Sequence, residues 1–191
     1  MRNYKTVFLS LLIITSSSCA FTKQQMSIQA APVEASRCAV SGRGKALVLN
    51  VSDEREDSSF IGKRIDGGAA IKDTGTTMPT FKQALQQSFQ NCGFKVTEAP
   101  PQKAIGLKVA LRSLSYTVMD GIWTGTVRMQ AAAQVSLLPK EDWSKMIREE
   151  RELKKAVVPS AKENERWMNE LISNLVAKIV GDKELSAKLI P

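Results

Sequence analysis

The strand that decides the fold reads Trp123-Thr124-Gly125-Thr126-Val127-Arg128-Met129-Gln130-Ala131-Ala132-Ala133-Gln134-Val135-Ser136-Leu137. Apolar and polar side chains alternate along it, so that one face carries Val127, Met129 and Val135. A period of two over this length predicts one arm of an antiparallel hairpin, with one face toward the core and the other toward water. The water-facing side is the candidate interaction face, and it consists of Thr124, Thr126, Arg128, Gln130 and Gln134.

Further elements are predicted before this hairpin. Residues 46–51 form a continuous apolar run, which is typical of a buried strand. Residues 52–78 contain short apolar segments that indicate short strands or an ordered loop. Helical spacing of Phe81, Leu85, Phe89 and Cys92 predicts a helix that begins at Pro79 and ends at Gly93. Strands follow at residues 94–96 and 105–111, and the alternation shifts near residues 112–113, which indicates a β-bulge or a change of the exposed face.

The C-terminal part contains one clear helix and one ambiguous segment. Ser160-Ala161-Lys162-Glu163 is a capping box, and the apolar stripe from Trp167 to Val180 predicts a helix that faces the core. Residues 141–157 have a helix-forming composition, but they follow a strand and a turn as a further strand of a meander would. Local propensity alone favours a helix there.

The beginning of the chain has the layout of a bacterial export signal. Arg2 and Lys5 precede a short apolar run, and small residues lead to Cys19. The run is shorter than the roughly 20 apolar residues that a membrane-spanning helix needs. We therefore expect residues 1–18 to be removed as a lipoprotein signal peptide and Cys19 to carry the lipid. Because Ser16 stands where such signals usually have Leu, ordinary cleavage that releases a soluble periplasmic protein is the alternative.

Two further cysteines lie after the expected lipid site. Residues 19–44 show no sustained period and are interpreted as a flexible tether, followed by a single globular domain over residues 45–191. Cys38 and Cys92 are an even remainder of thiols in an oxidising compartment, which permits one disulfide. The alternative is that Cys92 is a small buried residue of the predicted helix.

Composition limits the chemistry that the chain can perform. Histidine is absent, which removes the usual general base, the Ser-His-Asp triad and His-containing zinc sites. The acidic cluster of residues 53–57 offers carboxylates, but no feature of the sequence sets their separation, so we interpret it as a solvated loop. We expect no catalytic residues, no metal site and no cofactor. Loss of residues 1–18 lowers the net charge from +8 to +6, and an exported protein meets no nucleic acid.

Taken together, these elements resemble the YajG-like family of bacterial outer-membrane lipoproteins. The resemblance rests on the Cys19 signal, on residues 47–55, on residues 81–96, and on the order of the long hairpin and the C-terminal helix. It implies an α+β domain, with an antiparallel-rich sheet that carries two helices on one face, preceded by a flexible lipidated tether. It also implies that residues 144–157 are a strand and that the protein is attached to the outer membrane, facing the periplasm. It supplies no catalytic residue.

Two classes of function are consistent with these features. The first is a non-enzymatic, lipid-anchored envelope protein that docks another envelope protein, as an accessory subunit of a trans-envelope secretion or efflux complex does. Its contact surfaces would be the candidate interaction face and any open sheet edge, since edges invite strand addition. The alternative is a periplasmic ligand-binding module for lipid, glycolipid or peptidoglycan, which would need a cavity between helices and sheet.

Overall fold

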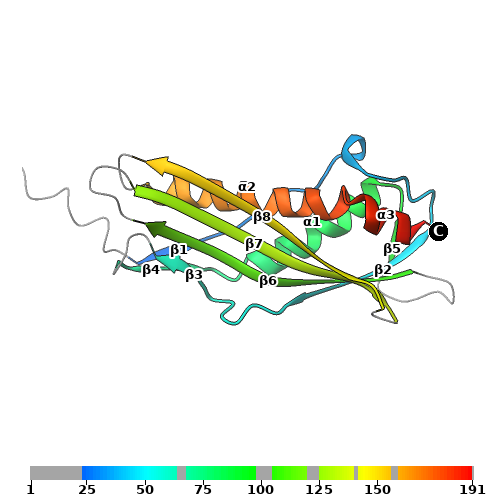
Figure 1. Cartoon of the computed structure of the whole chain (residues 1–191), viewed down its shortest axis with the longest axis horizontal. Helices are drawn as coiled ribbons and strands as arrows, with labels where there is room; N and C mark the ends of the chain where they lie inside the picture. The colour runs from blue at the N-terminus through cyan, green and yellow to red at the C-terminus, as the bar shows by residue number, and fades with distance from the viewer. Residues whose placement is uncertain are drawn as a thin grey trace, which may run out of the picture.

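The computed structural model describes residues 23–63, 68–97, 105–119, 125–139, 142–155 and 159–190. Within these ranges the chain forms an elongated α+β domain with an eight-stranded sheet and three α-helices (Figure 1). The strands are β1 Gln24–Met26, β2 Ala46–Asp53, β3 Phe60–Lys63, β4 Ala70–Asp73, β5 Lys95–Thr97, β6 Ile105–Met119, β7 Gly125–Leu138 and β8 Ser144–Lys155. The helices are α1 Thr77–Asn91, α2 Ala161–Val180 and α3 Lys183–Leu189, with a 3-10 turn η2 at Ala35–Arg37.

Strand β6 is the centre of the sheet. On one side it pairs antiparallel with β7, which pairs antiparallel with β8. On the other side it runs parallel to β2 along its first half and meets β3 at Tyr116. Gly62 is required at this meeting point, because a Cβ there would lie 1.8 Å from the Tyr116 carbonyl oxygen. The order β1-β4-β3 continues one side of the sheet, and β5 pairs parallel with β2 at the other end.

The structure confirms the predicted fold class: an α+β domain whose mixed sheet is mostly antiparallel, with its helices on one face. The predicted β-bulge is present, since the register between β6 and β7 shifts between Leu111 and Ser113. The predicted capping box forms at Ser160 and Glu163. Gly93, the second residue after α1, has a φ of 83°, as its predicted role as the helix stop requires. Helix α3 is an addition to the two helices that were expected.

Residues 144–157 were ambiguous, and the structure places 144–155 in strand β8. Twelve consecutive residues of β8 pair with β7, from Ser144 opposite Ser136 to Lys155 opposite Gly125. Because β8 is held by its pairing with β7, every second side chain of β8 faces α2. These tertiary interactions outweigh the helix-forming propensity of the β8 residues.

The flexible tether expected over residues 19–44 is wrong from Gln24 onward. Residues 24–26 pair with β4 as strand β1, and Met26 and Ile28 are fully buried. The ordered domain therefore includes about 20 residues more than the predicted start at residue 45, and Cys19 lies outside the described residues. We call residues 24–38 the N-terminal strap, because they run along the helical layer from β1 to Cys38 (Figure 1).

The core lies between the sheet and the helices. From α2 it receives Trp167, Met168, Leu171, Ile172 and Leu175, each no more than 2% exposed. The apolar face of the decisive strand β7 is buried opposite them, as its alternation predicts.

Shortening Leu171 or Leu175 to Ala should lower the free energy of unfolding by about 2–5 kcal/mol, because each removal leaves a cavity beneath α2. Chemical denaturation measures this loss. Arg166→Ala, an exposed position on the same helix, should change the stability by no more than about 0.5 kcal/mol. Unchanged stability of both leucine variants would contradict the core assignment.

Candidate functional site

The candidate interaction face lies on the side of the sheet opposite the helices. Thr126, Arg128, Gln130 and Gln134 share the outer face of β7, where Arg128 is exposed and the other three are half-buried. Thr124 falls outside the described residues. In Figure 1 strands β6, β7 and β8 lie in front of the helices, so no described helix covers this face.

Strand register extends the face onto both neighbours of β7. Gln130 lies between Ser115 of β6 and Glu150 of β8, and Ala132 lies between Ser113 and Arg148 in the next row. The β6 and β7 side chains at the centre of the face are therefore small and uncharged, with hydroxyl and amide groups, whereas the exposed β8 neighbours Arg148 and Glu150 are charged. The sequence pattern found the β7 positions, but only the register shows which β6 and β8 residues join them.

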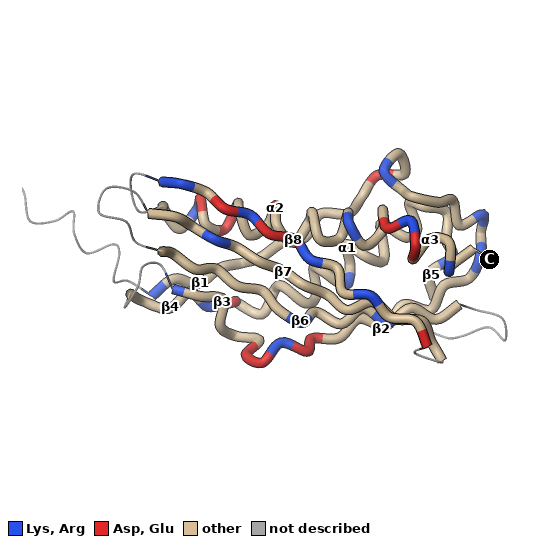
Figure 2. Tube along the Cα trace, in the orientation of Figure 1, with Lys and Arg blue, Asp and Glu red and all other residues tan. Residues whose placement is uncertain are grey.

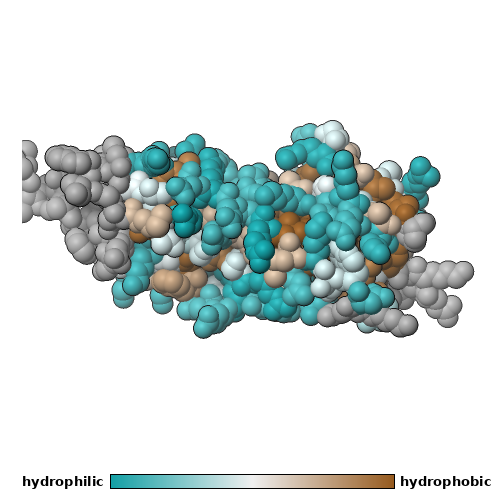
Figure 3. Space-filling view, in the orientation of Figure 1, coloured by the Kyte–Doolittle hydropathy of each residue, from teal (hydrophilic) through white to brown (hydrophobic). Residues whose placement is uncertain are grey.

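Two charged groups on this face are already paired. The Arg128 guanidinium donates a hydrogen bond of 3.1 Å to Glu152. Arg112 donates to the side-chain oxygen of Gln134 and forms an ion pair of 2.8 Å with Glu54. Exposed pairs of this kind contribute little stability, but they neutralise Arg112 and Arg128 and hold these long side chains in place. Figure 3 shows the result as a mostly hydrophilic surface with small, separate apolar areas.

One open edge of the sheet is less suited to binding. Strand β8 forms that edge, and eight of its twelve residues are charged. Its inward-facing members form ion pairs with α2 and the segment after it; the pairs are Lys145–Asp182, Glu149–Lys178, Arg151–Glu170 and Lys155–Glu163. Dense charge on an edge strand disfavours the addition of another strand. The outer sheet face, rather than this edge, is the better candidate surface.

The N-terminal strap lies along the outer side of the helical layer. Its amides donate to side chains of α2: Ser27 to Glu165 at 3.2 Å, Gln29 to Asn169 at 2.8 Å and Ala31 to Ser173 at 2.9 Å. Two extended residues advance about 6.6 Å, and four helical residues advance about 6.0 Å. The donors at every second strap residue therefore stay nearly in step with acceptors at every fourth helix residue.

A buried polar network fixes the beginning of the strap. The Tyr116 hydroxyl donates to Asn164 at 2.7 Å, and the Asn164 amide donates to Gln24 at 3.3 Å. Gln24 in turn donates to the backbone carbonyl of Ala161 at 3.0 Å. These contacts join β6, α2 and β1, and they satisfy polar groups whose burial without partners would be costly.

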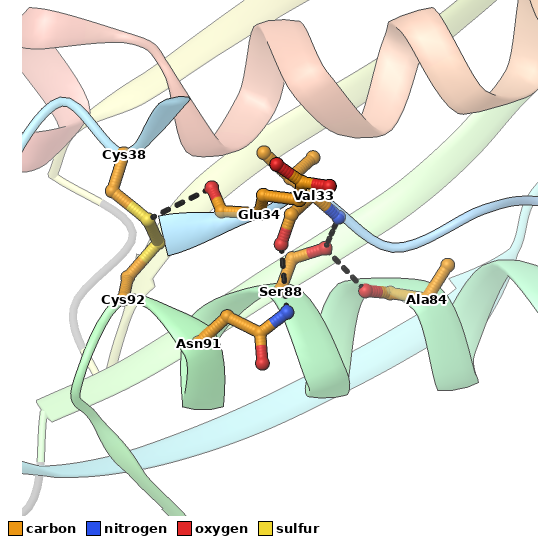
Figure 4. The surroundings of a disulfide bond; sticks show 7 residues. All are labelled: Val33, Glu34, Cys38, Ala84, Ser88, Asn91 and Cys92. Carbon is orange, nitrogen blue, oxygen red and sulfur yellow. Dashed lines mark hydrogen bonds between the residues drawn. A yellow bond between two sulfur atoms is a disulfide. The ribbon is translucent and has the colours of Figure 1, made fainter. Parts of the chain in front are cut away.

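A disulfide between Cys38 and Cys92 fixes the far end of the strap (Figure 4). Their Cα atoms lie 5.6 Å apart, and Cys92 is the residue directly after α1. Beside it, Val33 is held from both sides: its amide donates to the Ser88 hydroxyl at 2.8 Å, and its carbonyl accepts from Asn91 at 2.8 Å. The sequence allowed either a disulfide or a buried, unbonded Cys92, and the structure contains the disulfide.

The acidic cluster of residues 53–57 holds a structural arginine. Arg55 is 4% exposed and contacts Asp53 at 2.8 Å and Asp73 at 3.5 Å. The hydrogen bond from Arg55 lowers the pKa of Asp53. Hydrogen bonds from Ser59 likewise lower the pKa of Asp57. A carboxyl group that acts as a general acid near neutral pH needs a raised pKa, so these carboxylates are built to remain charged.

The described residues offer little else that resembles a reaction or ligand site. Within them no group of three or more Cys, Asp or Glu side chains is placed to hold a metal ion. The large hollow beside α2, about 1150 Å³, is open to solvent and is lined by polar residues such as Lys162, Arg166 and Asn169. No helix in the described part of the chain is long and apolar enough to cross a membrane.

Comparison with known proteins shows the class of this protein. A family model described as uncharacterized lipoprotein matches residues 34–190, and the chain belongs to that bacterial lipoprotein family. No curated protein matches the chain.

Solved structures with a similar course of the chain are distant in sequence. A Xanthomonas campestris protein of the DUF330 family has 11% identity and a TM-score of 0.47, covering 87% of this chain and 99% of that one. A minor lipoprotein from Acinetobacter baumannii has 12% identity and a TM-score of 0.46, covering 77% and 96%. Likenesses at this level do not assign a function.

The disulfide should contribute strongly to stability. Closing a loop between residues 54 positions apart is worth about 4 kcal/mol in the chain-entropy model, so the double variant Cys38→Ser, Cys92→Ser should unfold at a clearly lower urea concentration. The wild type should shift in the same way when it is reduced. Full alkylation of both cysteines in unfolded, non-reduced protein would show that the bond does not form.

The strap should protect its own amides from hydrogen exchange. Asn169→Ala and Ser173→Ala each remove one acceptor, so exchange at Gln29 and Ala31, respectively, should accelerate while the β6–β7 ladder stays protected. The neighbouring exposed change Arg166→Ala is the matched control and should leave strap exchange unchanged. Rapid exchange throughout residues 27–33 of the wild type would contradict the docked strap.

Proposed function

We propose that this protein is a non-enzymatic, lipid-anchored envelope lipoprotein that docks another envelope protein through the outer face of β6, β7 and β8. Membership of the lipoprotein family supports the envelope location. The proposal has three more specific parts. The protein is attached to the outer membrane through Cys19, and it is similar to the YajG-like lipoproteins. It serves as an accessory subunit of a trans-envelope secretion or efflux complex.

The uncovered sheet face is the observation that carries this proposal. Its three strands are the longest in the described structure, and β7 is held by paired strands on both sides. The charged side chains Arg112 and Arg128 are neutralised within the face. The partner that suits it is a protein surface that supplies uncharged hydrogen-bonding groups to Ser115 and Gln130 and groups of opposite charge to Arg148 and Glu150 at the β8 side.

A ligand-binding role has less support from the same geometry. Sites for lipids are enclosed and mostly apolar, whereas the two large hollows beside α2 are open and lined mainly by charged and polar residues. Carbohydrate can stack on exposed aromatic rings, and the described residues of the outer sheet face include none. Lipid, glycolipid or peptidoglycan therefore remains the alternative class of ligand.

The anchor can be tested at Cys19. Its thiol is the group that would accept diacylglycerol, so Cys19→Ser should release the domain from the membrane fraction or leave the signal peptide attached. Fractionation of envelopes after a high-salt wash measures this. If the variant stays with the outer membrane after cleavage of its signal, lipid is not what holds the protein.

The docking face can be tested by site-specific photo-crosslinking in intact cells. A photoreactive residue at Gln130 should yield one discrete protein adduct, and Ala132→Arg should abolish that adduct by placing an unpaired charge at the centre of the face. The matched controls are a photoreactive residue at Ala187 and the change Ala187→Arg, because Ala187 is exposed on α3 on the helical side.

The outcome separates the two functional classes. A protein adduct from Gln130 that Ala132→Arg removes and Ala187→Arg spares supports docking. An adduct from Ala187 alone, or a lipid or glycan adduct from Gln130, would overturn the assignment of this face to a protein partner.

A further inference from the structure

One end of the elongated domain is defined by strand register. Lys63 ends β3 beside the C-terminal part of β6, and Met119 at the end of β6 lies opposite Thr126, which lies opposite Lys154 of β8. Gln24 begins β1 at the same end, and its side chain reaches Ala161 at the start of α2. We call this the β1 end; it lies at the left of Figure 1.

The described chain begins at this end. Cys19 precedes Gln24 by five residues, which span at most about 17 Å when fully extended. The free tether of 25 residues that the sequence suggested would let the domain turn in any direction, but the docked strap removes most of that length. A lipid on Cys19 would therefore hold the β1 end within a short distance of the membrane surface.

The β1 end also carries several exposed positive charges. Lys23, Lys63, Lys154 and Lys162 are exposed there, and Lys155 lies 4.8 Å above the Trp167 ring. The nearby acid Glu163 accepts hydrogen bonds from the backbone and hydroxyl of Ser160 and forms an ion pair of 4.0 Å with Lys155. Figure 2 shows basic residues at the opposite end as well, so charge alone does not distinguish the ends. The point at which the chain leaves the domain does.

We infer that the β1 end rests on the anionic, phosphate-bearing headgroups of the membrane, with Lys23, Lys63, Lys154 and Lys162 toward the lipid. The inference rests on the lipid anchor at Cys19 that the proposed function includes. Ammonium groups on a tethered surface are drawn to anionic headgroups within about one Debye length, 8–10 Å. The domain then stands upright, and the twelve residues of β8 extend about 40 Å away from the membrane.

Energy transfer in vesicles tests this orientation. The full-length lipidated protein, with Cys38 and Cys92 paired, is given one donor fluorophore at Met119→Cys or at Ser144→Cys. Both positions are exposed, and they lie at opposite ends of the sheet. It is reconstituted into vesicles of phosphatidylethanolamine and phosphatidylglycerol that contain a headgroup-labelled acceptor. Strong transfer from position 119 and weak transfer from position 144 is the expected result.

Charge reversal supplies the matched control. Lys63→Glu, Lys154→Glu and Lys162→Glu together should clearly reduce the difference between the two positions, as should vesicles of phosphatidylcholine alone, because only the short anchor then holds the β1 end near the membrane. Lys95→Glu, Lys183→Glu and Lys188→Glu change the net charge equally at the opposite end and should leave the difference intact.

Each remaining outcome has a definite meaning. Equal transfer from both positions in the unreversed protein, or a difference that near-end reversal leaves intact, would overturn the headgroup contact while leaving the anchor standing. Protein that fails to float with the vesicles would overturn the anchor and the orientation together.

Discussion

The fit of the N-terminal strap to α2 is the constraint on which the rest of this structure depends. Extended chain and helix advance at rates that nearly match when every second residue of one meets every fourth of the other. The acceptors Glu165, Asn169 and Ser173 therefore serve three strap amides in succession. With those amides bonded to α2, and with the carbonyls of Met26 and Ile28 accepting from Thr74 and Thr80, the side chains of Met26 and Ile28 are fully buried. The strap thus closes a side of the core that the helices alone would leave open.

The elements that sequence predicts correctly are those whose signals are local. Alternation along β7, the parity shift at residues 112–113 and the capping box at Ser160 each lie within one element, and all three are present. Strand β8 is different because its composition favours a helix. What makes it a strand is the β7 ladder and the charges of α2, both of which are distant in the sequence. The family resemblance, rather than propensity, gave the correct assignment there.

The strap and α3 were missed for different reasons. Met26 and Ile28 do alternate with polar residues, but two apolar positions are too few to distinguish a short strand from a linker. Its helical partners, such as Asn169 and Ser173, look like the ordinary polar face of an amphipathic helix. Helix α3 had a readable signal, because Asp182 caps it by accepting from the Leu185 amide. The sequence pattern identified the β7 residues of the candidate interaction face. Their neighbours on β6 and β8 could be identified only from the strand register in the structure.

The strap also determines how an anchor would act on the domain. A lipid attached to a long, free linker holds a protein near a membrane without orienting it. Here β1 follows Cys19 after only five residues, so a force on Cys19 would be transmitted to β1. From β1 it would pass to β4 through the strand pairing and to the buried network of Gln24, Asn164 and Tyr116. The disulfide at Cys38 prevents the strap from peeling away at its other end. A lipid at Cys19 would therefore act on the core and the sheet together. With the β1 end on the membrane, as we infer, the outer sheet face would point sideways, where a partner in the same envelope layer could reach it.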